Sequence, residues 1–231
     1  MNIFKKNFIH WMVIFLVDVM AIILSCKMIA NGNIRLLNLL YESIYSDILI
    51  IAVFVPNFIV LILDAIGENI KNNIILAYGS KMKWIGSILK KIIVSANIYS
   101  FILLLPIFAV FIIGSGFHIE IVSIIYFFIL FMSYSVIFIF LSLVACALKI
   151  KWRSNILGVI TAVLISFIPN ILSFLFRGNG LPVFSQLINV TYAFRNGHFF
   201  IFQTIFVCVT EISLSFIIYL VICKIVMRKD F

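Results

Sequence analysis

The sequence predicts an all-α integral membrane protein with six transmembrane helices, and three observations support this fold class. Hydrophobic residues make up 65% of the 231 residues and charged residues only 11%, whereas an average soluble domain has about 25% charged residues. The chain also contains 25 phenylalanines, too much apolar surface for one water-soluble core. Finally, apolar runs of about 20 residues, long enough to cross the hydrocarbon core as a helix, recur along the chain.

Six apolar runs qualify as approximate membrane spans. They are residues 8–30, 47–66, 92–113, 121–148, 156–176 and 199–223. These runs occupy most of the chain, so we expect residues 1–231 to form a single transmembrane domain. The first run is too long for the apolar core of a signal peptide and carries Asp18 at its middle, so we expect it to be the first span.

The distribution of basic residues predicts the topology. With the N-terminus on the cytoplasmic side, thirteen of the 17 lysines and arginines fall in the cytoplasmic segments. Cytoplasmic loops of membrane proteins carry an excess of Lys and Arg. We therefore predict a multi-pass protein of the cell membrane with both termini cytoplasmic. This topology and the anionic lipid headgroups account for the net charge of +9 without a nucleic-acid partner.

The segment between the last two spans, residues 177–198, is expected to form a lid on the outer side. It is too polar for a seventh span and too apolar for a free loop. Gly178 and Gly180 interrupt the preceding helix, and the stretch from Pro182 through Tyr192 to Phe194 is typical of a short helix at or within the outer leaflet.

The most polar part of the chain is the segment at residues 67–91, which we call the coupling segment. Apolar residues recur in it at steps of three or four, as on one face of a helix. Gly79 interrupts this pattern, and Ser80 is a suitable N-cap for a following helix. We expect two helices joined at Gly79, the first on the cytoplasmic membrane surface and the second continuing into the third span.

The residues of this segment resemble the cytoplasmic signature of ABC-2-type exporter permeases. The resemblance rests on an acidic residue followed by Asn, an Asn-rich triplet, a Gly-x-Ser-Arg-like stretch and a later Lys. In this chain these are Glu68, Asn69, Asn72, Asn73, Ile74, Tyr78, Gly79, Ser80, Lys81 and Lys90. Asn73 replaces the usual Thr, and Lys81 replaces the commoner Arg, which loses a bidentate donor fork. Composition and size look most like bacterial permeases that handle antimicrobial peptides.

The resemblance implies a permease subunit that works with a separate ATPase. The coupling segment, including Trp84, would dock on a cytoplasmic ATP-binding-cassette protein, with two ATPases and a second permease copy or homologous permease per complex. The substrate would be a hydrophobic or amphipathic peptide. The chain itself has no phosphate-binding loop of the G-x-x-x-x-G-K-[ST] type. We therefore expect no enzymatic activity, catalytic residue, metal or cofactor in this chain, with ATP and Mg on the partner.

Two acidic residues lie at the middle of predicted spans, Asp18 in the first and Glu211 in the sixth. An ionisable group at this depth costs at least about 2.5–3.5 kcal/mol, so it faces protein or water. One interpretation is that both residues, with Gln203, line a pathway for a cationic substrate. The other is a protonated carboxyl group bonded to a neighbouring hydroxyl, such as that of Thr210 or Ser213.

Three other classes of protein were compared with the permease. An intramembrane hydrolase would need closely spaced ligands, but His10, His118 and His198 lie far apart near span ends. A peptide-sequestering immunity protein shares the predicted topology and differs only in lacking an ATPase. A proton-coupled carrier would use Asp18 and Glu211. The four cysteines have no metal-ligand spacing and are expected to be small buried hydrophobic residues.

Overall fold

A computed structural model describes residues 12, 16, 50–67, 78–114, 121–175 and 201–228, and all the regular structure in these residues is helical. The first element is a π-helical segment, η1 (Ile50–Phe54), which leads directly into α5 (Val55–Gly67). Three long helices and one of intermediate length follow. They are α7 (Lys81–Gly114), α8 (Ile121–Trp152), α9 (Asn155–Leu175) and α12 (Ile201–Arg228).

Three of the helices are long and apolar enough to cross a membrane. The stretches that meet this criterion are Lys81–Pro106, Phe127–Trp152 and Cys208–Arg228. Two shorter apolar helical stretches, Ile51–Gly67 and Asn155–Ile168, accompany them. The prediction of an all-helical fold is therefore confirmed for the described residues, and the length and composition of three helices are those of membrane spans.

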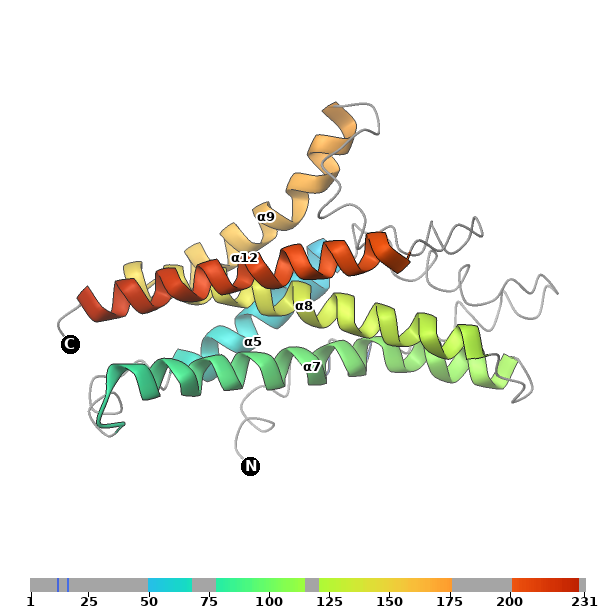
Figure 1. Cartoon of the computed structure of the whole chain (residues 1–231), viewed down its shortest axis with the longest axis horizontal. Coiled ribbons are helices and arrows are strands. Elements are labelled where there is room, and N and C mark those ends of the chain that lie inside the picture. The colour runs from blue at the N-terminus through green and yellow to red at the C-terminus, as the bar shows by residue number, and fades with distance from the viewer. Residues whose placement is uncertain are drawn as a thin grey trace.

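Helix α8 lies at the centre of the bundle and packs against α5, α7, α9 and α12. Figure 1 shows α7, α8 and α12 extended along the long axis, while α9 diverges from them and α5 crosses behind. The C-terminal ends of α5, α8 and α12 and the N-terminal ends of α7 and α9 gather at one end of the bundle (Figure 1). We call this end the basic end, because it carries every lysine and arginine of the described residues.

Aromatic rings hold the centre of the bundle together. The Phe58 ring of α5 lies 4.7 Å from both Tyr99 of α7 and Phe138 of α8, measured between centroids. The Tyr99 hydroxyl donates a 3.0 Å hydrogen bond to the carbonyl oxygen of Phe54, at the junction of η1 and α5. Pro56, two residues after Phe54, has no backbone N–H to donate a helical hydrogen bond. The π-helical segment η1 ends just before it, at Phe54.

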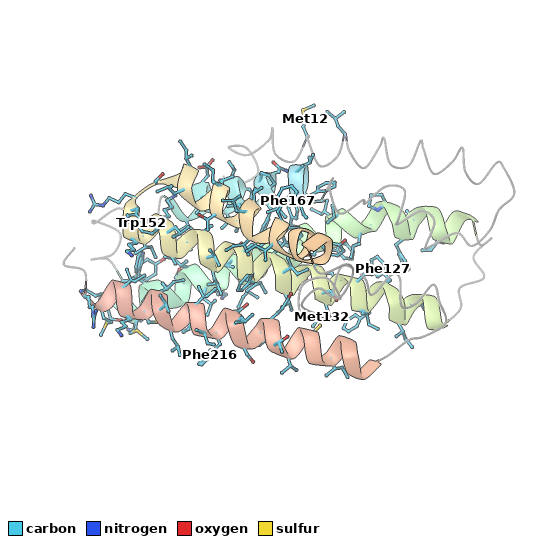
Figure 2. All side chains as sticks on the ribbon, turned by 90° about the horizontal axis from the view of Figure 1, so that it is seen from above. Met12, Phe127, Met132, Trp152, Phe167 and Phe216 are labelled. Atoms are coloured by element: carbon cyan, nitrogen blue, oxygen red, sulfur yellow. The ribbon has the colours of Figure 1, made fainter. Side chains whose placement is uncertain are left out.

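Large apolar side chains cover the outside of the bundle. On α12 the Phe216 side chain is 59% exposed and points away from the other helices (Figure 2). Trp152, at the C-terminal end of α8, is also exposed, and it lies at the basic end, where an amphipathic ring suits a lipid headgroup region. Large apolar side chains exposed in this way are typical of a protein surface that faces the hydrocarbon core of a membrane.

The C-terminal ends of α8 and α12 continue to Trp152 and Arg228, past the predicted span ends at 148 and 223. The segment between the predicted spans 121–148 and 156–176 is mostly helical, because α8 continues through Trp152 and only Arg153 and Ser154 separate it from α9. Arg153 ends α8 in the left-handed conformation, with φ at 56°. Its N–H still bonds to the Lys149 carbonyl at 2.8 Å, and Ser154 caps α9 through the Leu157 N–H.

Several predictions lie outside the described residues. These are the first span at 8–30 apart from Met12 and Leu16, the first part of the coupling segment at 68–77, and the outer segment at 177–198. The described helices overlap the five other predicted spans in sequence, and three of them contain a stretch long and apolar enough to cross a membrane.

Candidate functional site

The second half of the coupling segment is described, and it has the predicted local structure. Gly79 has a φ of 68°, the left-handed conformation that glycine adopts without steric cost. The Ser80 hydroxyl accepts a hydrogen bond from the Lys83 N–H at 3.2 Å and so caps α7. The hydroxyls of Tyr78 and Ser87 share a 2.9 Å hydrogen bond across this turn. The chain direction is therefore fixed where the segment enters α7.

The helix that follows the turn continues without a break into the membrane-spanning part of α7. Its 34 residues correspond to about 51 Å of helix at 1.5 Å per residue. The expectation that the second helix of the coupling segment continues into the third span is confirmed. A displacement of the turn at Gly79 would therefore be transmitted along one continuous helix.

The predicted coupling residues of α7 differ in accessibility. Gly79, Ser80 and Lys90 are exposed, as is Lys83, and Lys81 is half-buried. Trp84 is 0% exposed and belongs to the core cluster together with Ile85 and Ile88. Its indole therefore anchors the start of α7 in the bundle and does not present itself to a partner. Glu68, Asn69, Asn72, Asn73 and Ile74 lie outside the described residues.

Lys149 joins the end of α5, where the coupling segment begins, to α8. Its ammonium group donates a hydrogen bond to the carbonyl oxygen of Leu63 in the last turn of α5. It also lies so close to Gly67 that a Cβ atom at that position would come within 2.8 Å of Nζ. A cation at a helix C-terminus is stabilised by the partial negative charge of the carbonyl groups there. Sequence reasoning treated Lys149 only as a topology signal and overlooked Asp64, the acidic residue beside it in α5.

Gly158 permits a close approach of three helices near Lys149. A Cβ atom at this position would lie 3.1 Å from Leu63 Cδ1 and 3.2 Å from the Ala145 carbonyl oxygen. The start of α9 is therefore packed directly on α8 and α5. Together with Lys149 and the two capped helix starts, this contact fixes the helix ends around the coupling segment.

Glu211 is the predicted pathway residue that the structure describes in full. It lies on α12, is 0% exposed, and neither carboxylate oxygen has a hydrogen-bond partner among the described residues. The suggested partner Ser213 is exposed and donates instead to the Val209 carbonyl at 2.8 Å. Gln203 lies in the first turn of α12, and Asp18 falls outside the described residues.

Other buried polar side chains lie at a similar depth. The Cys208 thiol, one turn before Glu211, is close to both the Glu211 carboxyl group and the Ser133 hydroxyl of α8. Ser100 lies fourteen residues before the C-terminal end of α7, and Ser135 lies fourteen residues after the N-terminal end of α8. Because these two ends are consecutive in the chain, both serines lie about 21 Å along their helices from the α7–α8 connection. We call Ser100, Ser133, Ser135, Glu211 and Ser215 the mid-depth layer.

The mid-depth layer was not recognised in the sequence apart from Glu211. Serine is small and common among apolar residues of transmembrane helices, so single serines carry little signal. The spacing of Glu211 and Ser215, four residues apart on one helix face, was the available indication. Within the described residues no group of His, Cys, Asp and Glu could hold a metal ion.

Comparisons with known proteins give no match for this chain. No protein-family profile, no curated protein and no solved structure is detectably similar to it. Its function is therefore inferred from the residues and the geometry given above.

Proposed function

We propose that this protein is the transmembrane permease subunit of an ATP-binding-cassette exporter, driven by a separate ATPase chain. The observation that carries the proposal is the turn at Gly79 and Ser80. It lies at the basic end, between two apolar helices, and it matches the residue pattern that resembles the coupling region of ABC-2-type permeases. The exposed Lys83 and Lys90 beside this turn would contact the ATPase.

The orientation follows from the basic end. The lysines and arginines of the described residues all gather there, and the positive-inside tendency supports a cytoplasmic location for this end. In the proposed protein six spans cross the cell membrane, both termini are cytoplasmic, and the segment at 177–198 covers the outer side. Two permease chains and two ATPases form the complex, and a hydrophobic or amphipathic peptide is the substrate.

The force transmission that we propose uses the connections at the basic end. The ATPase moves the coupling segment, the bond between the Lys149 ammonium group and the Leu63 carbonyl ties α8 to α5, and α5 and α7 follow at the two ends of the segment. Both helices meet at the ring contacts of Phe58 with Tyr99. Movement at the basic end would thus reach the middle of the bundle.

Co-purification from the native host tests the proposal. The full-length protein, expressed with its neighbouring genes and solubilised in mild detergent, is isolated, and the retained proteins are identified by mass spectrometry. We expect a stoichiometric ATP-binding-cassette protein with the wild type. Loss of this protein in Glu68→Ala and Gly79→Ala would assign the contact to the coupling segment.

Gly86→Ala provides the matched control for Gly79→Ala. Both glycines are exposed, and a Cβ atom at either position would meet nothing within 4 Å, but only Gly79 has a positive φ. An alanine forced into that conformation costs about 1–2 kcal/mol, so only the first variant should distort the turn. If no ATPase is retained by the wild type in any mild detergent, the permease proposal is wrong. A peptide-sequestering protein or a proton-coupled carrier would then be the better account.

A further inference from the structure

The buried carboxyl group of Glu211 raises a question that the proposed export function leaves open. Both of its oxygens lack a hydrogen-bond partner among the described residues, and so do the hydroxyls of Ser100, Ser135 and Ser215. A buried polar group without a partner costs about 1–3 kcal/mol, and more when it is charged. Several such groups on three neighbouring helices are unusual in a folded bundle.

No basic residue in the described part of the chain can neutralise Glu211. The nearest one on the same helix, Lys224, is thirteen residues away, about 20 Å along α12. The titratable side chains described on the helices packed around the mid-depth layer are a thiol and two phenols, which carry no positive charge in any protonation state: Cys208 of α12, Tyr134 of α8 and Tyr99 of α7. Lys149 and Cys146 lie nearer the basic end. Among the described residues, the group left to neutralise Glu211 is therefore a proton.

The packing of α12 differs between its two halves. Within the described side chains, its buried apolar residues are Ile222 and Val226, both toward the basic end. At mid-depth the Cys208 thiol lies close to Ser133 of α8 and Glu211 and Ser215 are buried, while Val209, Ile212 and Phe216 are exposed. Separating α12 from α8 at mid-depth would hydrate the unpartnered groups.

We propose that Glu211 is a proton-binding site inside the helix bundle, protonated while α8 and α12 are packed together and ionised when they separate and admit water. In the release step the carboxyl O–H bond breaks and a water molecule takes the proton as hydronium, leaving the carboxylate. The serine hydroxyls of the mid-depth layer then hold the water that hydrates the charge, since a buried water needs about two to four polar partners. The inference does not depend on an ATPase.

Infrared spectroscopy of the full-length protein in lipid bilayers tests the first half of the proposal. At neutral pH the wild type should show the carbonyl stretching band of a protonated carboxyl group, and this band should be absent from the spectrum of Glu211→Gln. Glutamine keeps the size and the hydrogen-bonding groups of protonated Glu, so the bundle should fold. Identical wild-type and variant spectra in this region would show that Glu211 is ionised and overturn the proposal.

Alkylation of the native Cys208 tests the second half of the proposal, that α8 and α12 separate when Glu211 is ionised. A variant that retains only this cysteine is reconstituted in vesicles, and its alkylation by a membrane-impermeant maleimide is measured at increasing pH. Ionisation of Glu211 favours separation, so the rate should rise several-fold more than in the same variant with Glu211→Gln. The ratio of the two rates removes the ordinary pH dependence of the thiol. A ratio that stays constant with pH would show that ionisation of Glu211 does not open the bundle, and would overturn the proposal.

Discussion

The basic end and the mid-depth layer of this bundle differ in whether their polar side chains have hydrogen-bond partners. At the basic end Ser80 and Ser154 cap helices, and Lys149 binds the carbonyl oxygen of Leu63. In the mid-depth layer the carboxyl group of Glu211 and most of the serine hydroxyls have no partner among the described residues.

This difference suggests that the basic end keeps one helix arrangement, whereas the helices at the mid-depth layer are suited to a change of packing. Satisfied polar groups favour one arrangement, because moving them breaks hydrogen bonds. Unpartnered groups favour any arrangement that gives them water or a ligand. In the proposed exporter the basic end would transmit the movement of an ATPase, and the middle of the bundle would respond to it. Four pairs of substitutions test this comparison through stability.

The largest loss is expected from Lys149→Met, which keeps the length of the side chain and removes the ammonium group. A hydrogen bond to a charged group is worth about 1.5–3 kcal/mol, and the apparent melting temperature in detergent should fall accordingly. Lys151→Met is the matched control, because Lys151 is exposed and its ammonium lies 4.5 Å from the centroid of the Trp152 ring. Equal losses in the two variants would mean that the contact with Leu63 stabilises nothing.

The close approach of α9 is tested by Gly158→Val. Any Cβ atom here meets Leu63 Cδ1 and the Ala145 carbonyl oxygen at 3.2 Å or less. Overpacking of this kind costs about 1–3 kcal/mol, measurable as a lower midpoint in thermal unfolding. Gly86→Ala has open space around it and should be neutral or stabilising. A fully tolerated valine at 158 would show that α9 is not fixed against α8.

Serine residues in the two regions should respond differently to alanine. Ser154→Ala removes the cap that accepts the Leu157 N–H at 3.3 Å, and losing a cap costs about 1 kcal/mol. Ser215→Ala removes a buried hydroxyl that has no partner among the described residues, so the free energy of unfolding should stay the same or rise. Reversal of this order in unfolding titrations would contradict the comparison.

The smallest contrast is between two neighbours on α7. Tyr99→Phe keeps the ring contacts and removes the hydroxyl that donates to the Phe54 carbonyl, a loss of about 0.5–1.5 kcal/mol. Ser100→Ala removes a hydroxyl of equal burial with no partner among the described residues. Only the tyrosine variant should unfold at lower denaturant concentration.

The sequence was sufficient for the features that depend on local chemistry. Gly79 and Ser80 were identified because a left-handed turn and an N-cap each require particular residue types at one position. The class of fold followed from composition and from the length of the apolar runs. The permease function and the pathway role of Glu211 stay proposals.

Features that depend on contacts between distant residues were not predictable. Lys149 binds a carbonyl oxygen 86 positions away in the chain. Because every residue has a backbone carbonyl group, the sequence does not indicate which one accepts this bond. The predicted span ends at residue 148, before Lys149 and Lys151, whereas α8 continues through both. The serines of the mid-depth layer became recognisable only when α7, α8 and α12 were aligned in space.

The unfolding free energies of Glu211→Leu and Lys149→Met, measured side by side in one lipid environment, test the comparison most directly. Leucine replaces a buried carboxyl group without partners by an apolar side chain, which is often neutral or stabilising. The account predicts that Glu211→Leu is as stable as the wild type or more stable, while Lys149→Met is less stable. A loss in Glu211→Leu as large as that in Lys149→Met would show that the carboxyl group is a structural contact, and would contradict the division between the two regions.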